Sequence, residues 1–447
     1  MADVIVVGSG AMGLAAAFHA INEGHSVEVL EAAPEPGGMA AHFDLAGLSI
    51  ERFYHFVCKS DTETMKLLGE LGILDKLRWR KTSMGMFTDG KLHDWGNPVA
   101  LLKFGKISLL SRLRYAVFAF VSVHRERWDA IETESARSWI TRWCGTEVYD
   151  QLWKPLFDLK FFHYAENISA AWIWTRIKRI GRSRRSMMQE ELGYIDGGTQ
   201  TLVDALCSAI RDRGGKIRLG CSVQKVLVKD GRVTGVATST GNIRADAVIC
   251  TVPTPLVSSM VPSLPEDWKA RYDSIVNIGV CCLVFKLKRS VSPHFWVNIN
   301  QPDVDIPGVI EFSNLRPVGD ETVIYIPYYM PTEHEKFSWQ NDALLDEAFR
   351  YLQLINPHLV RADIIASCVA RLRHAQPVCE PGFASKIPPV QTPILGLQVA
   401  DTCFYYPEDR GISESARLGY EMAVRLNSQD ISHPQSFAQN EPEGLVA

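Results

Sequence analysis

The cysteine pattern of the chain excludes two kinds of site. Ten cysteines are scattered over 447 residues, Cys281-Cys282 is the only close pair, and no C-x-x-C occurs. Redox dithiols and structural zinc sites use C-x-x-C or similar spacings, so the sequence predicts neither. Scattered thiols without a disulfide pattern fit a reducing compartment, and we expect a cytoplasmic protein.

The chain also lacks a hydrophobic run of membrane-spanning length. The best candidate, residues 115–123, is far shorter than the roughly 20 residues that a spanning helix needs, and arginines flank it at 112, 114 and 125. Two interpretations stay open: a buried helix of a helical subdomain, or an apolar helix at a membrane face or lipid-substrate entrance. A large excess of one charge is missing too, since the net charge of −4 gives no whole-chain case for nucleic acid.

What is present is a nucleotide-binding pattern at the start. A strand (3–7), a G-x-G-x-x-G turn (8–13), a glycine-terminated helix (14–24) and a second strand ending in Glu31 follow one another. Gly8 permits the tight turn, Gly10 lets backbone approach a pyrophosphate, Gly13 lets the helix pack on the strand, and the helix N-terminus offers free N–H groups. Glu31 can accept hydrogen bonds from a ribose diol. The alternative is a glycine-rich turn in an ordinary α/β unit. Because the pattern starts so close to Met1, we expect no signal peptide ahead of it.

The remaining chain predicts an α/β protein of two or three domains. We expect a discontinuous nucleotide-binding domain (1–75, 193–270 and 390–427), a mainly helical substrate subdomain (76–192), a mixed-sheet substrate domain (271–389) and a flexible tail (428–447). A hairpin is expected at 43–51 and an amphipathic helix at 62–77. The basic cluster at 176–185 predicts a solvated loop, with binding of an anionic substrate group or a membrane headgroup as the alternative.

Three stretches together resemble the flavin amine oxidase superfamily: the N-terminal unit with Glu31, the pair Gly37-Gly38, and the C-terminal residues 397–401 and 411–419. Residues 197–206, 223–226 and 246–253 support the likeness, which covers residues 3 to about 426. It is nearest to the protoporphyrinogen-oxidase-like and phytoene-desaturase-like members. The resemblance implies a Rossmann-type, glutathione-reductase-like FAD-binding domain with a mixed-sheet and helical substrate domain.

The resemblance also implies how FAD would be held. The adenosine ribose would lie on Glu31, the pyrophosphate on 10–13, the adenine edge on the backbone of Val223, and the isoalloxazine beside the backbone of Gly411 and Ile412, with Asp401 reaching the pyrophosphate and ribityl region. The residues expected to bind FAD are Gly8, Gly10, Ala11, Met12, Gly13, Glu31, Ala32, Gly37, Gly38, Met39, Tyr54, His55, Val223, Thr251, Asp401, Gly411 and Ile412.

The chain departs from the family in three places. Met39 stands where an arginine is common, so one flavin contact is lost or reassigned. Gly411 stands where monoamine oxidases place an aromatic residue, which counts against a simple amine substrate. Cys379 and Cys403 are offset from the site of covalent flavin attachment, so we expect non-covalent FAD.

Hydride transfer to a flavin needs mainly positioning, so a catalytic dyad need not be visible. His55 is the best candidate for a catalytic polar group; the alternative is a histidine hydrogen-bonded in its loop. Arg410 either touches substrate or orders the flavin-facing turn.

The main hypothesis is an FAD-dependent oxidase, dehydrogenase or desaturase. It would act on a small, mainly apolar substrate, with O₂ or another electron acceptor and no nucleic-acid partner; peripheral membrane contact and the oligomeric state stay open. The alternatives are a flavin-dependent isomerase of the sugar-nucleotide mutase type, an amine oxidase and, least favoured, a non-enzymatic prenyl-protein carrier.

Overall fold

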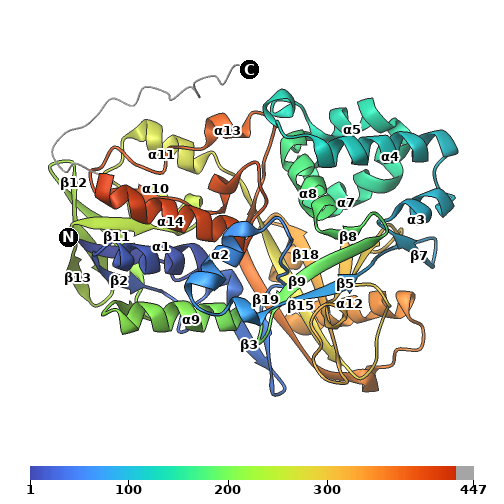
Figure 1. The fold of residues 1–447 in the computed structure, drawn as a ribbon, viewed down its shortest axis with the longest axis horizontal. Coiled ribbons are helices and arrows are strands. Elements are labelled where there is room, and N and C mark those ends of the chain that lie inside the picture. Colours follow the sequence, from blue (N-terminus) through green and yellow to red (C-terminus); the bar gives the residue numbers. More distant parts are fainter. Residues whose placement is uncertain (429–447) are drawn as a thin grey trace.

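The computed structural model describes residues 1–428, and the expected flexible tail beyond them lies outside the described residues. The first unit is β1 (Asp3–Val7), α1 (Ala11–Asn22) and β2 (Ser26–Leu30), as the sequence predicts. These strands belong to a parallel sheet of order β10-β2-β1-β14-β20, completed by β10 (Lys216–Arg218), β14 (Ala247–Cys250) and β20 (Leu397–Val399). One sheet therefore combines strands from the start, middle and end of the chain (Figure 1).

Two layers cover this sheet. On one face α1 packs against α9 (Thr199–Asp212) and α14 (Ile412–Ser428), and α14 also contacts α2 (Thr62–Glu70). The other face packs on the antiparallel sheet of β11 (Val223–Lys229), β12 (Arg232–Thr238) and β13 (Gly241–Arg244), with α10 (Val257–Met260) and α11 (Glu266–Asp273). Coverage on both faces explains why β1 and β14 are almost continuously apolar and buried.

A second, seven-stranded sheet has the order β19-β15-β18-β17-β16-β6-β7. Its strands are β6 (Met84–Thr88), β7 (Lys91–Trp95), β15 (Asn277–Leu287), β16 (Trp296–Ile299), β17 (Gly308–Glu311), β18 (Thr322–Met330) and β19 (Ile364–Pro377). The β16–β6 pair is parallel and the others are antiparallel, so the sheet is mixed. The helix α12 (Asn341–Ile355) packs on one face, and the other face adjoins the helical region.

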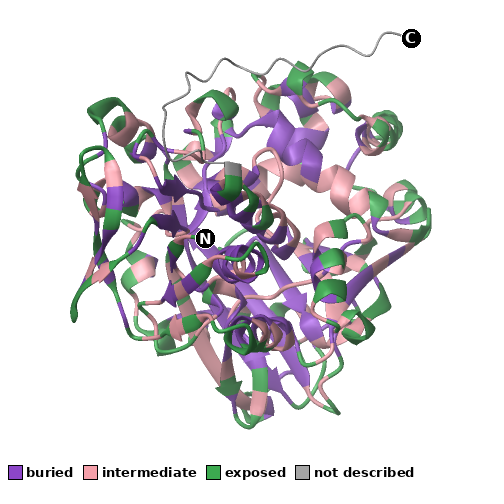
Figure 2. Cartoon of the chain, turned by 60° about the vertical axis from the view of Figure 1, so that its left-hand side comes forward, coloured by how far each residue is buried: buried purple, intermediate pink, exposed green. Residues whose placement is uncertain are grey.

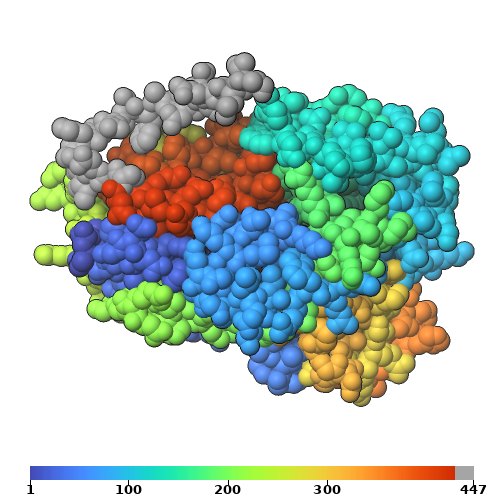
Figure 3. All heavy atoms as spheres, in the orientation of Figure 1, coloured from blue at the N-terminus to red at the C-terminus, as the bar shows by residue number. Residues whose placement is uncertain are grey.

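The helical region shares a hydrophobic core with the seven-stranded sheet and forms the upper right surface in Figure 3. It contains α3 (Pro98–Lys103), α4 (Leu109–His124), α5 (Ala136–Cys144), α6 (Thr146–Val148), α7 (Lys154–Phe161) and α8 (Ala170–Arg182). The remaining elements are the hairpin β3 (His42–Leu45) and β4 (Leu48–Glu51), the small sheet of β5 (Leu77–Thr82), β8 (Arg184–Ser186) and β9 (Gln189–Ile195), and α13 (Phe383–Lys386). The buried interior runs through both sheets (Figure 2).

Several sequence expectations need correction. The helix expected at 62–77 ends at Glu70, because Gly72 takes a left-handed backbone (φ +71°), and Leu77 already begins β5. The region expected to be mainly helical, 76–192, begins with the strands β5, β6 and β7 and ends with β8 and β9. The cluster at 176–185 is not a solvated loop, since residues 176–182 form the last turns of α8. No helix among residues 1–428 is long and apolar enough to cross a membrane.

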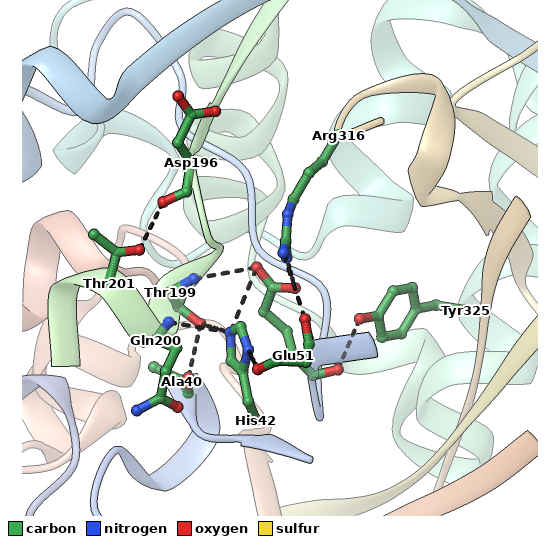
Figure 4. Close-up of polar contacts among 10 residues, drawn as sticks. Ala40, His42, Glu51, Asp196, Thr199, Gln200, Thr201, Arg316 and Tyr325 are labelled. Carbon is green, nitrogen blue, oxygen red and sulfur yellow. Dashed lines mark hydrogen bonds and ion pairs between the residues drawn. The ribbon is translucent and has the colours of Figure 1, made fainter. Parts of the chain in front are cut away.

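A buried polar network ties the hairpin β3–β4 to both neighbouring parts (Figure 4). The Glu51 carboxylate pairs with Arg316 at 2.8 Å and accepts from the Thr199 N–H at 3.2 Å, while its backbone carbonyl accepts from the Tyr325 hydroxyl at 2.7 Å. His42 lies in the same cluster, 3.1 Å from the Thr199 hydroxyl. The N-terminus of α9, Arg316 and strand β18 are thereby joined through one residue, Glu51.

Candidate active site

One large cavity, of about 480 Å³, lies where the two sheets and the helical region meet. Four strands of the parallel sheet (β1, β2, β14 and β20) end beside it, and the loops that follow them line it at 8–12, 31, 251–253 and 401–402. In open α/β sheets ligands bind outside the carboxyl ends of the strands, and this cavity has that position. The remaining walls come from 53–57, α8, β15, β18, β19 and the turn 408–412.

The glycine turn is tight on its protein side and open on its cavity side. Gly8 has φ +100°, and a Cβ there would lie 2.8 Å from the Thr251 hydroxyl oxygen. A Cβ at Gly13 would lie 2.0 Å from the Gly8 carbonyl oxygen, so α1 can start only with glycine there. At Gly10, by contrast, no heavy atom lies within 4 Å of such a Cβ. The turn therefore leaves a bare backbone cradle facing the cavity.

The Glu31 carboxylate lines the cavity and is held in place by the glycine turn. One oxygen accepts from the Ser9 N–H and hydroxyl, both at 2.8 Å, and the other accepts from the Ala33 N–H at 2.8 Å. These donors fix the direction of the carboxylate while the residue stays partly exposed to the cavity.

Asp401 is more completely enclosed. One carboxylate oxygen accepts from the Thr254 N–H (2.6 Å) and hydroxyl (3.0 Å), and the other accepts from the Cys403 N–H (2.8 Å), which caps the short 3₁₀ turn at 402–405. Gly411 and Ile412 follow at the start of α14, and a Cβ at Gly411 would meet no atom within 4 Å. A second bare segment of backbone thus faces the same cavity.

An ionic wall comes from α8. Arg179 donates two hydrogen bonds to Asp61, at 2.9 and 2.6 Å, and Arg176 pairs with Asp409 at 2.8 Å. All four residues line the cavity. Burial opposes ionisation of Asp409, but Arg176, Lys160 and Arg410 outweigh it and hold the pKa of the carboxyl below its usual value. The sequence singled out the cluster but not this inward pair, whose only signal is the i, i+3 spacing of two arginines on one helix face.

The facing wall is apolar and aromatic. Tyr54 stacks edge-on against Trp296, with ring centroids 5.5 Å apart, and Tyr329 lies beside them on β18. The apolar lining comprises Phe53, Tyr54, Phe56, Val57, Val280, Cys282, Trp296, Pro327, Tyr329 and Leu372. Most of these residues belong to the seven-stranded sheet or to the aromatic loop 52–57, so the cavity has one apolar side and one ionic side.

His55 and Arg410 both line the cavity. Burial, together with the positive charges of Arg410 and Arg179, lowers the pKa of His55 to about 4, so its imidazole is neutral at physiological pH. Arg410 donates to the Tyr329 hydroxyl at 2.8 Å and to the Ala375 carbonyl. It therefore ties the turn before α14 to the seven-stranded sheet.

Two further ionisable groups lie at the ionic side. Burial, and then the nearby Glu414, raises the pKa of the cavity-lining Glu408 above its ordinary value. Lys160 is 7% exposed, and its ammonium lies 4.7 Å from the ring centroid of Tyr329. Burial, and then Arg176, lowers the pKa of Lys160 well below its usual value.

The sequence matches one family over most of its length. The model of the family described as flavin-containing amine oxidoreductases matches residues 13–369. The chain belongs to this family. It is a flavin-dependent oxidoreductase, and its cofactor is FAD.

Individual relatives of this flavoenzyme are distant. The 15-cis-phytoene desaturase of Solanum lycopersicum is 22% identical over 443 residues, covering 89% of this chain and 73% of that protein. The fold is similar to that of a candidate protoporphyrinogen oxidase from Exiguobacterium sp. 255-15 (TM-score 0.74, 16% identity, 96% and 99% of the two chains). It is also similar to that of a reduced UDP-galactopyranose mutase (TM-score 0.73, 16% identity, 96% of each chain).

Most residues expected to bind FAD lie at the cavity of this flavoenzyme. Fourteen line it: Gly8, Gly10, Ala11, Met12, Glu31, Gly37, Gly38, Met39, Tyr54, His55, Thr251, Asp401, Gly411 and Ile412. Gly13, Ala32 and Val223 do not line it; Gly13 packs α1 on the glycine turn, and Val223 starts β11 in the core behind the sheet. The bare backbone at Gly10 and Gly411, with a fixed carboxylate at Glu31, fits a flavin dinucleotide.

Proposed function

We propose that the protein is an FAD-dependent oxidase, dehydrogenase or desaturase that removes a hydride from a C–H bond of a small, mainly apolar substrate. The observation that carries the proposal is that one cavity joins the glycine turn and Glu31 to the aromatic wall of the seven-stranded sheet. The cofactor and substrate positions would then share one enclosed space.

In this proposal FAD is held mainly by backbone. The turn at 8–12 and the first residues of α1 would bind the pyrophosphate, Glu31 would bind the ribose, and the backbone at Gly411 and Ile412 would lie beside the isoalloxazine. The Asp401 side chain is buried (6% exposed) and caps the 402–405 turn, so we assign it to shaping that turn. With no cysteine at the usual attachment position, the FAD would be non-covalent.

The bound flavin supplies the hydride-accepting chemistry, and the chain supplies position and electrostatics. The aromatic wall would orient the apolar part of a substrate and exclude water. His55, neutral and enclosed, could accept a proton from a substrate as the hydride leaves. Arg410 would act as a positioning residue, because it holds the flavin-facing turn against Tyr329. O₂ or another acceptor would reoxidise the flavin.

A flavin-dependent isomerase is the second candidate. It is supported by the ionic wall of Arg176 and Arg179, which could face an anionic substrate group, and by the fold shared with a UDP-galactopyranose mutase. An amine oxidase is supported less, because Gly411 supplies no aromatic side chain to orient an amine.

Anaerobic mixing separates these reactions. The purified yellow protein is mixed without O₂ with apolar polyenes and dihydro-heteroaromatics, with primary amines, or with sugar nucleotides, and the flavin absorbance is followed. An oxidase or desaturase is bleached by an apolar substrate and recovers its colour when an acceptor is added. Turnover of a sugar nucleotide only after prior reduction, with no bleaching by any apolar compound, would contradict the proposal and establish the isomerase.

A further inference from the structure

The helix α4 exposes apolar side chains on its outward face, although its inward face also buries an apolar side chain, Phe118. Ser111 and Ser122 are buried (8% and 1% exposed), whereas Phe120 and Leu110 are 63% and 66% exposed. The Ser122 hydroxyl is satisfied by the Phe118 carbonyl at 2.7 Å. A surface helix normally presents polar side chains to water, so the outward face of α4 is built for another environment.

This outward face is a continuous stripe. At about 100° per residue, positions 109, 110, 113, 117 and 120 fall within roughly one quarter to one third of the helix circumference. The apolar side chains of α3 continue it, because Arg112 of α4 bonds to the Leu102 carbonyl. The β8–β9 hairpin tip lies next to α3, since Arg184 bonds to the Gly96 carbonyl.

We call these nine exposed side chains the apolar face: Val99, Leu102, Leu109, Leu110, Leu113, Val117, Phe120, Met187 and Met188. They are half of the eighteen large apolar side chains that are exposed within residues 1–428.

The charges around the apolar face are almost all positive. Residues 95–125 and 176–189 contain no aspartate or glutamate but eleven lysines and arginines, and all of these except the cavity-lining Arg176 and Arg179 belong to the surroundings of the apolar face. Asp89 pairs with Lys106, Glu126 pairs with Lys178 and Arg182, and Glu147 accepts from Ser108 and Ser111. Lys103 and Arg185 form no ion pair within the described part of the chain. The rim of the apolar face is therefore basic.

We propose that the apolar face docks on the surface of a bilayer containing anionic phospholipids. Exposed leucine, phenylalanine and methionine side chains would enter the interfacial region while the basic rim contacts the headgroups. A protein partner would need both an apolar surface and negative charges placed around it to fit this face. An anionic lipid surface supplies negative charge at every point around the inserted side chains, so lipid is the occupant that we infer. The docked helix α4 is linked to the cavity through α8, which packs against α4 and lines the cavity through Thr175, Arg176, Arg179 and Ile180.

Docking on a bilayer has a consequence for how a substrate reaches the cavity. This consequence rests on the proposed function, whereas the docking itself does not. An apolar substrate partitions into lipid, and α8, which lines the cavity, packs directly against α4, which carries the apolar face. Docking would place the cavity beside the phase that holds such a substrate.

Vesicle flotation of the full FAD-loaded chain tests the docking and needs no turnover. We expect the protein to float with vesicles of phosphatidylcholine plus phosphatidylglycerol and roughly tenfold less with phosphatidylcholine alone, with binding weakened by salt. Leu110→Glu with Phe120→Glu should reduce binding at least about tenfold, because two charges would replace inserted apolar groups. Lys103→Gln with Arg185→Gln should remove most of the preference for anionic vesicles.

The matched control is Leu354→Glu with Val360→Glu, two side chains of similar exposure (50% and 52%) on and just after α12. It should bind vesicles as the wild type does, and flavin absorbance reports folding of every variant. Wild-type protein that does not float with anionic vesicles, or Leu110→Glu/Phe120→Glu protein that floats as the wild type does, overturns the proposal. A concentration-dependent dimer that this double variant abolishes, without vesicle binding, would instead make the apolar face a self-association surface.

Discussion

The charged side chains at the cavity differ in how far their polar atoms are already hydrogen-bonded within the protein and how far they stay accessible from the cavity. The carboxylate oxygens of Asp401 and Asp61 accept hydrogen bonds from protein donors, and the charges of Asp61 and Arg179 neutralise each other. Glu31 is anchored by Ser9 and Ala33, yet it keeps a surface at the cavity. A carboxylate that is both anchored and accessible suits ligand hydroxyls, because its orientation is set before the ligand arrives.

Glu31→Ala should therefore weaken FAD binding without unfolding the protein. Loss of charge-assisted hydrogen bonds costs about 1.5–3 kcal/mol, or roughly ten- to a hundredfold in Kd. Equilibrium dialysis or fluorescence titration of apoprotein with FAD measures the change. Glu28→Ala is the matched control, since Glu28 lies on β2, three residues before Glu31, but pairs with Arg218. Wild-type FAD affinity in Glu31→Ala would mean that the ribose assignment is wrong.

His42 gives a prediction about pH. Burial, followed by the charge of Arg316, lowers its pKa to about 3, and its Nε2 accepts from the Gln200 N–H at 3.1 Å, which requires the neutral ring. The unfolded chain binds a proton near pH 6.5 and the folded chain does not. The stability contributed by the neutral ring is therefore present above pH 6.5 and falls by up to about 1.4 kcal/mol per pH unit as pH drops toward 3.

The measurement is the difference in urea unfolding free energy between wild type and His42→Gln, from pH 7 to pH 4. We expect wild type to lose stability relative to the variant as the pH falls, because glutamine does not titrate. Taking the difference removes the contribution of buried carboxyls that do not contact His42. Burial raises the pKa of one such group, Glu311, to about 7, and its effect on stability has the opposite pH dependence. A pH-independent difference would contradict the neutral, buried ring.

At the scale of elements, the hairpin β3–β4 acts as a connector between the parallel-sheet region and the seven-stranded sheet. The pair of Glu51 and Arg316 is 2% and 10% exposed in its side chains, so neither charge is solvated by water. Breaking a buried pair leaves one charge uncompensated, which costs far more than removing both. Gly198 adjoins the same cluster, and a Cβ there would lie 2.5 Å from atoms of both charged residues.

Arg316→Met should destabilise the fold by about 3–5 kcal/mol at neutral pH. Glu51→Gln introduced into the same chain should recover a large part of the loss. Urea unfolding of both single variants and the double variant gives the coupling between them. Additive effects of the two substitutions would show that the pair is not coupled, and would remove the connector role of the hairpin.

The elements also show what could be predicted from sequence. The unit of β1, α1 and β2 was predictable because its signals are local: an apolar strand, three glycines and a periodic helix. The strands β6 and β7 were not predicted, because they are completed by β16, about 200 residues further along the chain. The inward direction of Arg176 and Arg179 depends on how α8 packs, which no local pattern encodes. Most of the residues predicted to bind FAD line the cavity, Asp401 among them, whereas Gly13, Ala32 and Val223 do not.

At the scale of the whole molecule, the cavity lies between the parallel sheet, the seven-stranded sheet and the helical region, so a ligand bound there contacts all three. A ligand that binds only the folded state adds RT ln(1 + [L]/Kd), or about 2.7 kcal/mol at a hundredfold excess over Kd. Added FAD should therefore raise the urea midpoint of the apoprotein in a concentration-dependent way. Acid precipitation should leave the yellow colour in the supernatant. Yellow colour retained on the pellet, or a urea midpoint that does not change with FAD concentration, would contradict non-covalent binding of FAD in this cavity.

The order of strands in the parallel sheet has a consequence for synthesis on the ribosome. The N-terminal unit emerges first, but α1 packs against α14, and β20 is the last strand of its sheet. A nascent chain can form contacts only with segments that have already been translated, so contacts between distant segments form late. The apolar face of α1 thus stays without its final partner until about four hundred residues have been translated. The cavity, which is lined by residues of the glycine turn and by Asp401 to Ile412, is consequently complete only late in synthesis, and any early stop codon releases a chain with an uncovered N-terminal unit, which chaperones and proteases would recognise.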